Sequence, residues 1–160
     1  MAGFADDTIG AAAVPGARIL IVAARFNDAL VGMLRAGARA AIEQAGAVAT
    51  EILVPGSLEI PAAVVMALDA AIKAGAPFDG VVALGCVIRG DTYHFEIVAD
   101  VSARALMELS VARALPLGNG ILTVDNETQA LVRADTRQGD KGGEAARAAL
   151  ALVALKRSVS

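Results

Sequence analysis

The chain has few of the residues on which several kinds of functional site depend. It contains one cysteine, one histidine, one tyrosine and no tryptophan among 160 residues. Cys86 therefore has no partner for an internal disulfide, and a cluster of cysteine and histidine ligands for a metal is disfavoured. We expect no metal site. Because the sequence also lacks the pattern of a secretion signal, we expect a cytoplasmic protein.

Charge and hydropathy argue against two further classes. The net charge is −3 and lysine and arginine do not cluster, so neither nucleic acid nor an acidic membrane is favoured as a partner. Hydrophobic residues make up 56% of the chain, yet no apolar run approaches the roughly 20 residues that cross a bilayer. We expect part of this apolar surface to be buried between subunits. No Gly-x-Gly-x-x-Gly fingerprint joins a strand to a helix, which disfavours a dinucleotide and favours a small-molecule ligand.

Hydrophobic periodicity predicts strands that alternate with helices. Residues 18–24 form a continuous apolar run, typical of a strand covered on both faces, whereas Thr50 and Glu51 interrupt a strand closer to an edge. The expected strands are residues 18–24, 48–54, 81–88 and 120–124. The expected helices are residues 28–45, 57–75, 94–114, 126–134 and 142–157. The expected caps are Asn27 or Asp28 for the first helix, Ser57 for the second and Asn126 for the fourth. Three helices should each have one apolar face: Leu30, Leu34, Ala38, Ala41 and Ala45 in the first, Val98, Val101, Ala105 and Leu109 in the third, and Ala146, Ala149, Leu150 and Val153 in the fifth.

This alternation predicts an α/β fold, a three-layer αβα sandwich of flavodoxin-like type with a central parallel four-stranded sheet. We expect one domain over residues 1–160, with residues 1–17 as an N-terminal arm. Ligands of such sheets bind outside the carboxyl ends of the strands, where the unusual residues of this chain lie. They are Arg25-Phe26-Asn27 after the first strand, residues 56–59 after the second, residues 86–94 after the third and Asn126 after the fourth.

The stretch from residue 81 to residue 94 is the strongest candidate for a site. An apolar strand runs there into a polar turn that ends at the only histidine. An isolated histidine is more often structural, but this position favours an acid–base role for His94. Phe26 would ordinarily belong to a core, yet at a polar strand exit it is suited to stack on a planar ligand. Cys86 is expected to be a buried, inert thiol.

The remaining candidates each have an ordinary structural interpretation beside the functional one. Ser57 and Glu59 fit either a helix start or a polar contact to a ligand. Residues 90–92 form either a plain turn or, through free amides and the Thr92 hydroxyl, a site for phosphate oxygens. Arg133 is a helix-end charge that could also hold a phosphate.

Several blocks of the sequence, taken in order, resemble the 6,7-dimethyl-8-ribityllumazine synthase family. The resemblance spans about residue 18 to the C-terminus. The blocks are Arg25-Phe26-Asn27; residues 54–61 (Val-Pro-Gly-Ser-Leu-Glu-Ile-Pro); residues 85–92 (Gly-Cys-Val-Ile-Arg-Gly-Asp-Thr) with His94; residues 120–123 (Gly-Ile-Leu-Thr) with Asn126; Gln129-Ala130 with Arg133; and Lys141-Gly142.

The resemblance implies a reaction and a role for each site residue. Enzymes of this family condense 5-amino-6-(D-ribitylamino)uracil with 3,4-dihydroxy-2-butanone 4-phosphate to form the precursor of riboflavin, without metal or organic cofactor. The catalytic acid–base residue would be His94. The pyrimidine and its ribityl chain would contact Phe26, Ser57, Leu58, Glu59, the main chain of Cys86, Val87 and Ile88, and Asn119. The phosphate would be held by Asp91, Thr92, Arg133 and Lys141.

Assembly is also implied by the resemblance. Family members form pentamers with active sites at subunit interfaces, and some pentamers build icosahedral shells. Asn119 departs from the aromatic residue common in relatives and loses the stack that this residue would provide. Asp135 stands where shell-forming relatives commonly have glycine and lacks its freedom at positive φ, so we expect an isolated pentamer. Two alternatives remain: a non-catalytic flavin-binding or shell-forming member of the family, and a flavodoxin-like electron carrier.

Overall fold

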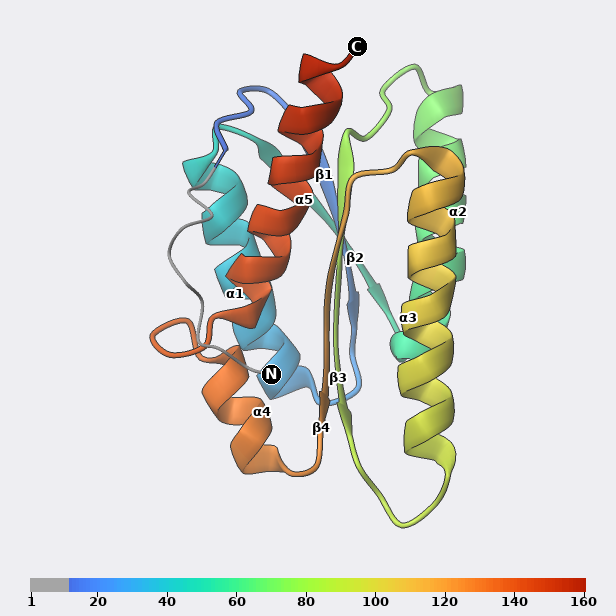
Figure 1. Cartoon of the computed structure of the whole chain (residues 1–160), viewed down its shortest axis with the longest axis vertical. Helices are drawn as coiled ribbons and strands as arrows, with labels where there is room; N and C mark the ends of the chain where they lie inside the picture. The colour runs from blue at the N-terminus through green and yellow to red at the C-terminus, as the bar shows by residue number, and fades with distance from the viewer. Residues whose placement is uncertain (1–11) are drawn as a thin grey trace.

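The chain folds into a parallel sheet held between two layers of helices (Figure 1). The computed structural model describes residues 12–160, so most of the expected arm lies outside the described residues. In chain order the elements are β1 (Arg18–Ala24), α1 (Asp28–Gln44), β2 (Val48–Val54), the 3₁₀ turn η1 (Ser57–Glu59), α2 (Ile60–Lys73), β3 (Gly80–Ile88), α3 (His94–Arg113), β4 (Leu117–Val124), α4 (Glu127–Ala134) and α5 (Lys141–Ser158).

The sheet has the strand order β2-β1-β3-β4, and every pairing is parallel. This is the flavodoxin-like order without a fifth strand, so the predicted fold class is confirmed. β1 and β3 lie in the centre and are buried almost throughout, which explains their continuous apolar sequences. β2 lies at an edge, as the polar residues within it predicted.

The helices cover the two faces of the sheet unequally. Figure 1 shows α1, α4 and α5 on one face, and α2 with α3 on the other. The first core is the larger and includes the predicted inner face of α1, because Leu30, Leu34, Ala38, Ala41 and Ala45 are all buried. The second core holds fewer buried residues, and its helices keep large apolar side chains exposed, among them Met66 and Met107.

α5 packs closely on α1 because its first turn is built from glycine. A Cβ atom at Gly142 would collide with the carbonyl oxygen of Leu34. Ala146, Ala149 and Leu150, on the predicted inner face of α5, are fully buried. The small residues at this contact therefore bring the two helix backbones together.

The predicted inner face of α3 is partly wrong. Val101 is 51% exposed, whereas its neighbour Ser102 is buried. The Ser102 hydroxyl donates a hydrogen bond to the Val98 carbonyl oxygen at 2.6 Å, which satisfies the buried polar group. The inner face is thus rotated toward Ser102 and Leu106, and the apolar side chain of Val101 is left at the surface.

β4 begins three residues earlier than predicted, at Leu117. The prediction missed residues 117–119 because glycine and asparagine are poor strand formers. Pairing with β3 starts at Val81↔Leu117, and α5 lies so close that a Cβ atom at Gly118 would collide with the Ala145 carbonyl. Tertiary packing therefore overrides the local preference.

Of the three predicted caps, Asn126 is confirmed, Asn27 occupies the N-cap position without a capping side-chain hydrogen bond, and Ser57 is wrong. Asn126 accepts a hydrogen bond from the Gln129 amide at 2.9 Å and caps α4 as expected. Neither Asn27 at the start of α1 nor Ser57 at the start of η1 forms a capping hydrogen bond through its side chain. Both residues instead lie at the carboxyl end of the sheet, where the pocket described below opens.

Asp135, where relatives that form shells commonly have glycine, adopts an ordinary backbone conformation. Asp135 has a φ of −59°, which any residue adopts, and its carboxylate accepts a hydrogen bond from the Arg137 amide at 2.9 Å. The positive φ in this link belongs to Asp140, at 43°. Asp135 thus has no positive φ in this chain, and the expectation of an isolated pentamer stays a prediction.

Candidate active site

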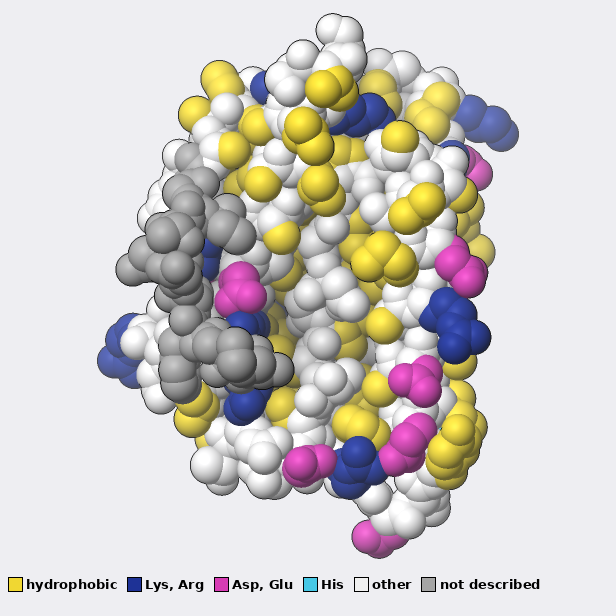
Figure 2. Space-filling view, viewed as in Figure 1, with side chains coloured by type: hydrophobic (Ala, Val, Ile, Leu, Met, Phe, Trp, Pro, Cys, Tyr) yellow, Lys and Arg dark blue, Asp and Glu magenta, His cyan; other side chains and the backbone are white. Residues whose placement is uncertain are grey.

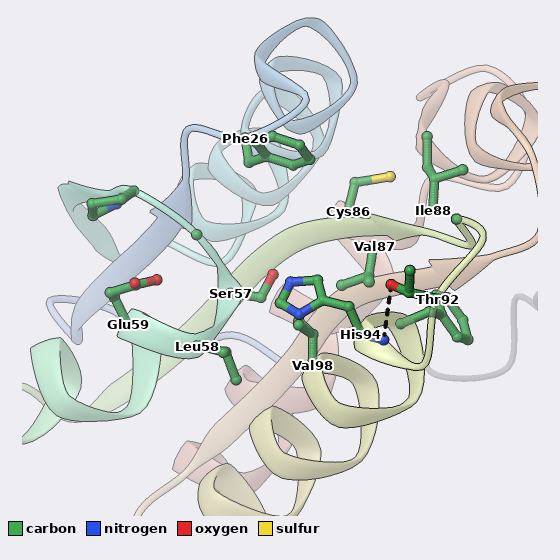
Figure 3. A pocket seen from close by; sticks show the side chains of 14 residues that line it. Phe26, Ser57, Leu58, Glu59, Cys86, Val87, Ile88, Thr92, His94 and Val98 are labelled. Carbon is green, nitrogen blue, oxygen red and sulfur yellow. Dashed lines mark hydrogen bonds between the residues drawn. The ribbon is translucent and has the colours of Figure 1, made fainter.

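A pocket of about 490 Å³ opens at the carboxyl ends of β1, β2 and β3 (Figure 3). It brings together most of the predicted pyrimidine and ribityl contacts with the predicted acid–base residue. The lining residues are Phe26, Pro55, Gly56, Ser57, Leu58, Glu59, Cys86, Val87, Ile88, Gly90, Thr92, His94, Phe95 and Val98. We call it the first pocket.

Phe26 presents its ring to this pocket from the exit of β1. The Phe26 amide donates to the Pro55 carbonyl at 3.1 Å, which ties the chain to the exit of β2. The side chain is 71% exposed, an unfavourable state for a phenylalanine that has no ligand against it. A planar ring lying on this face would remove that apolar surface from water.

Ser57 is a buried hydroxyl on the opposite wall. It is 7% exposed and lines the same pocket as the imidazole of His94 (Figure 3). Gly85 makes room for it, because a Cβ atom at that position would come too close to the Ser57 oxygen. Leu58 and Glu59 follow in the same turn with exposed side chains at the rim.

The end of β3 forms the floor of the pocket. Pairing with β1 ends at Ala23↔Leu84, whereas pairing with β4 continues to Ile88↔Val124. The last residues of β3 therefore have no strand neighbour on the β1 side within the described chain. A ligand can pair with main-chain groups at such an edge.

The Cys86 thiol is not suited to nucleophilic chemistry. Its side chain is 3% exposed, and burial raises the pKa of the thiol to about 11. It is thus protonated at neutral pH, and the nucleophilic form is the thiolate. The expected burial of Cys86 is confirmed, and its inertness stays a prediction.

His94 is the first residue of α3, and its exposed side chain lines the pocket. The His94 amide donates to the Thr92 hydroxyl at 3.4 Å, so the turn before the helix is tied to the residue that carries the imidazole. Gly90 and Thr92 belong to the lining, but Asp91 does not.

Arg89 is held by structural contacts at the edge of this pocket. Its guanidinium pairs with Glu96 and with Asp125, the latter at 3.0 Å, and lies 4.2 Å from the centre of the Phe95 ring. The hydrogen bond from Arg89 holds the pKa of Glu96 below its ordinary value. With two carboxylates against it, Arg89 is a poor candidate for neutralising a phosphate.

Three predicted residues lie elsewhere. Asn119, Arg133 and Lys141 line a second pocket of about 300 Å³, formed by β4, α4 and α5, which shares no lining residue with the first. The Asn119 side-chain oxygen accepts from the Ile121 amide at 3.0 Å, which leaves its amide hydrogens for a ligand. Arg133 donates to the Gln129 carbonyl at 3.1 Å and makes no ion pair within residues 12–160.

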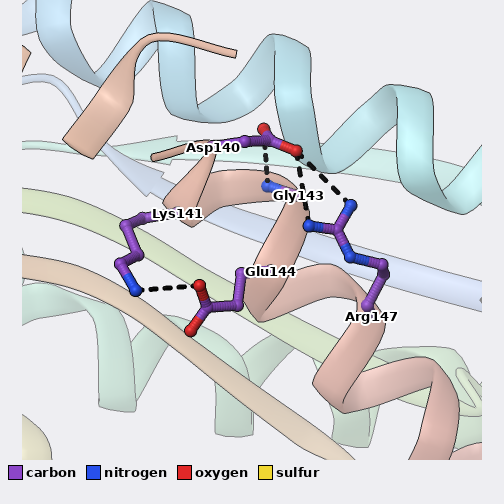
Figure 4. A network of polar contacts seen from close by, with 5 residues as sticks. All are labelled: Asp140, Lys141, Gly143, Glu144 and Arg147. Atoms are coloured by element: carbon purple, nitrogen blue, oxygen red, sulfur yellow. Dashed lines mark hydrogen bonds and ion pairs between the residues drawn. The ribbon is translucent and has the colours of Figure 1, made fainter. Parts of the chain in front are cut away.

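The sequence analysis missed Glu144 in the second pocket. Its carboxylate pairs with Lys141 Nζ at 2.8 Å, beside a second network in which Asp140 holds Gly143 and Arg147 (Figure 4). The spacing of Lys141 and Glu144, three residues apart at a helix start, was the signal that could have indicated the pair.

The described part of the chain contains neither a cluster of metal ligands nor a helix suited to span a membrane. No group of three or more histidine, cysteine, aspartate or glutamate side chains is placed to hold a metal ion among residues 12–160. None of the helices described here combines the length and apolar character of a membrane span.

Comparison with known proteins agrees with the resemblance of the sequence blocks. The family model for 6,7-dimethyl-8-ribityllumazine synthase matches residues 16–157. A protein of that name from Methylocella silvestris is 65% identical over 142 residues, covering 89% of this chain and 87% of the relative. One from Azorhizobium caulinodans is 62% identical over 144 residues, covering 90% and 89%. One from Rhodopseudomonas palustris is 55% identical over 155 residues, covering 97% and 93%.

The match extends over nearly all of the described chain and includes the segments that line both pockets. The chain belongs to the 6,7-dimethyl-8-ribityllumazine synthase family.

Proposed function

We propose that this chain is a 6,7-dimethyl-8-ribityllumazine synthase of riboflavin biosynthesis. It condenses 5-amino-6-(D-ribitylamino)uracil with 3,4-dihydroxy-2-butanone 4-phosphate. The 5-amino group attacks the ketone to give a Schiff base and water, phosphate leaves, and the second nitrogen closes the ring with loss of another water. The observation that carries the proposal is the first pocket, where an exposed aromatic ring, a buried hydroxyl, an open strand edge and the only imidazole meet.

Each wall of the first pocket suits one part of the pyrimidine substrate. The Phe26 ring stacks on the pyrimidine, and the main chain of residues 86–88 reads its polar edge. The Ser57 hydroxyl, the backbone of Leu58 and the Glu59 carboxylate bind the hydroxyl groups of the ribityl chain. Binding both reactants in one place converts a bimolecular step into an effectively unimolecular one.

His94 is the proton carrier in this proposal. Amine attack, phosphate departure and dehydration each require a proton to be taken up or returned, and an imidazole does both near neutral pH. The turn that contains Gly90 and Thr92 offers amide and hydroxyl donors to the phosphate next to this ring.

The cation for the phosphate comes from a neighbouring subunit in this proposal. Arg133 and Lys141 line the second pocket, on a different part of the chain from His94. A ring in which the second pocket of one subunit faces the first pocket of the next would unite them, and a repeated contact between two different patches closes such a ring. We propose a homopentamer whose active sites lie at these interfaces, where the first pocket with His94 meets Asn119 and Arg133 of the next subunit. Asp91 belongs to the turn that binds the phosphate in this proposal.

Exposed apolar surface supports assembly. Met66, Val101, Met107 and Val111 on α2 and α3 are all more than half exposed. Figure 2 shows further hydrophobic side chains gathered on the face that carries the edge strand β4. Exposed apolar side chains that gather on one face are typical of a protein interface.

The remaining parts of the proposal concern chain organisation and location. We propose that residues 1–160 form one domain with residues 1–17 as an arm, and that the enzyme works in the cytoplasm without a cofactor. An isolated pentamer is the proposed assembly, and an icosahedral shell is its alternative. Light scattering or native mass measurement tests this: a monomer would contradict the shared site, and a capsid-sized particle would replace the isolated ring.

A direct assay tests the reaction. Purified protein is mixed with both substrates, and lumazine fluorescence and released phosphate are followed together. Both signals should rise in equal amounts and should require both substrates. Protein that retains flavin and gives neither signal would support the non-catalytic alternative instead.

A further inference from the structure

Asn27 has an unusual backbone conformation and an unusual contact. Its φ of 61° and ψ of 49° lie in the left-handed region, which asparagine tolerates better than most residues other than glycine. It precedes α1 without capping it. Its side-chain amide instead donates a hydrogen bond to the Cys86 carbonyl oxygen at 2.9 Å. The contact joins the exit of β1 to the floor of the first pocket, across 59 positions of sequence.

This contact extends the sheet where β1 has ended. The β1–β3 ladder stops at Ala23↔Leu84, so the Cys86 carbonyl lies beyond the last paired residue of β1. The main chain after β1 turns toward β2, because the Phe26 amide donates to Pro55. The Asn27 side chain instead contacts β3, at a position where β1 no longer pairs with it. Phe26 is therefore held between the end of β2 and the end of β3.

The same contact determines which main-chain groups of β3 a ligand can use. The Arg89 amide donates to the Val124 carbonyl of β4, and successive residues of a strand direct their polar groups to opposite edges. Ile88 therefore faces the same edge as Cys86, toward the pocket. With the Cys86 carbonyl occupied by Asn27, Ile88 presents the remaining complete pair of N–H and C=O groups beyond the ladder.

We infer that Asn27 is a positioning residue that sets the register in which the pyrimidine pairs with β3. The inference rests on the proposed function. A uracil ring presents an N–H beside a C=O, which matches the single pair at Ile88 and leaves the ring beneath Phe26. Without the Asn27 amide, the Cys86 carbonyl is no longer held in place, and the end of β3 loses its fixed position beyond the β1 ladder. The pair at Ile88 is then no longer aligned for the register that places the ring near His94, so the pyrimidine binds more weakly.

Two substitutions separate the hydrogen bond from the backbone conformation. Asn27→Gly keeps the positive φ without strain and removes the donor. Asn27→Asp keeps the size, but its carboxylate can only accept and therefore repels the Cys86 carbonyl. Ser110→Ala is the matched control, because the Ser110 hydroxyl donates to the Leu115 carbonyl at 2.8 Å at the far end of α3.

The measurements are KM for each substrate, kcat, and the Kd of the pyrimidine substrate by calorimetry. For Asn27→Gly we expect KM and Kd for the pyrimidine to rise about tenfold, the effect of roughly one hydrogen bond, and KM for the butanone phosphate to change less than about twofold. Asn27→Asp should raise KM and Kd for the pyrimidine further, again with little change in KM for the butanone phosphate. Ser110→Ala should lower thermal stability and leave the ratio of the two KM values unchanged.

A parallel rise of both KM values, or an unchanged pyrimidine Kd in both Asn27 variants, would overturn the inference. Failure of the proposed function is recognised separately, because the unsubstituted protein would then form no lumazine. In that case the calorimetric Kd still decides the inference, since a pyrimidine Kd that does not depend on Asn27 contradicts it directly.

Discussion

The first pocket and the second pocket differ in chemistry more than in size. The first is lined mainly by apolar side chains and backbone, with one imidazole, whereas the second contains Arg133, Lys141 and Glu144. The first suits a planar ring and proton transfer, and the second suits an anion. This difference favours a mechanism in which carbon–nitrogen bond formation depends on the first pocket and phosphate binding depends on the second. Neighbouring subunits would then be needed to combine them.

The largest expected effect is in the first pocket. His94→Ala should lower kcat by on the order of 10² to 10⁴, the usual contribution of general acid–base catalysis, while the fold is kept. Some turnover should remain because the pocket still holds the reactants together. Steady-state kinetics with circular dichroism checks both points. An equal rate at several pH values would remove His94 from the mechanism.

A mixed assembly tests whether the two pockets act across subunits. His94→Ala damages only the first pocket and Arg133→Gln only the second, so coexpressed chains can pair an intact half from each. Random mixing in a ring should restore about a quarter of the wild-type activity per site, well above either variant alone. The assay uses the butanone phosphate below the KM of the Arg133 variant. Activity equal to the mean of the two variants would mean that each chain carries a complete site.

Arg133→Gln alone should affect one substrate selectively. Hydrogen bonds to charged groups contribute more than neutral ones, so KM for the butanone phosphate should rise roughly ten- to a hundredfold. KM for the pyrimidine should change little. The inhibition constant of inorganic phosphate, used as a competitive inhibitor, should rise by a similar factor. If both KM values rise together, the substitution has disturbed folding or assembly rather than phosphate binding.

The Lys141–Glu144 pair should give smaller effects of opposite sign. Glu144→Gln frees the Lys141 ammonium, so KM for the butanone phosphate should fall about two- to fivefold, within the range of a partly exposed ion pair. Lys141→Met should raise it by a similar factor. Raising the salt concentration should reduce both effects. Changes of the same sign in both variants would contradict the proposed role of the lysine.

Cys86 should have the smallest effect on turnover. Cys86→Ala should keep kcat within about twofold, because the thiol is protonated and the proposed contact to the pyrimidine uses only the main chain. The folded-state pKa of about 11 lies above the ordinary 9.0, so the thiol's contribution to the free energy of unfolding is complete below pH 9 and is lost as pH rises toward 11. Denaturant titrations at pH 8 and pH 11 measure how much the free energy of unfolding falls between the two pH values. This fall should be smaller in the alanine variant than in the unsubstituted protein. An equal fall in both proteins would mean that groups other than Cys86 cause the pH dependence.

Local patterns were most successful where one physical requirement dominated. The continuous apolar runs of β1 and β3 predicted central strands, and the apolar stripe of α1 predicted its buried face. The blocks that carried the family resemblance also predicted the lining of the first pocket. The face of α3 was partly mispredicted, because the hydrogen bond that allows Ser102 to be buried depends on the folded helix.

The role of Asn27 shows the limit of local reasoning. An asparagine before a helix is a good candidate for a cap, and the sequence contains nothing that favours a contact 59 residues away. The parallel pairing of β1 with β3 brings the two exits together, and only then does the Cys86 carbonyl become available. Glu144 was missed for a related reason, since its place beside β4 depends on the packing of α5.

The sequence by itself determined the alternation of strands and helices, the parallel sheet and the family, because periodicity and ordered motifs are properties of the linear chain. Only the tertiary structure decided that the predicted site residues, except Asp91, divide between two pockets, that Asn27 contacts the floor of the first, and that residue 135 has a negative φ. The physical reason is that these properties depend on where β1, β3, β4 and α5 end relative to one another. That arrangement is set by packing across the sheet.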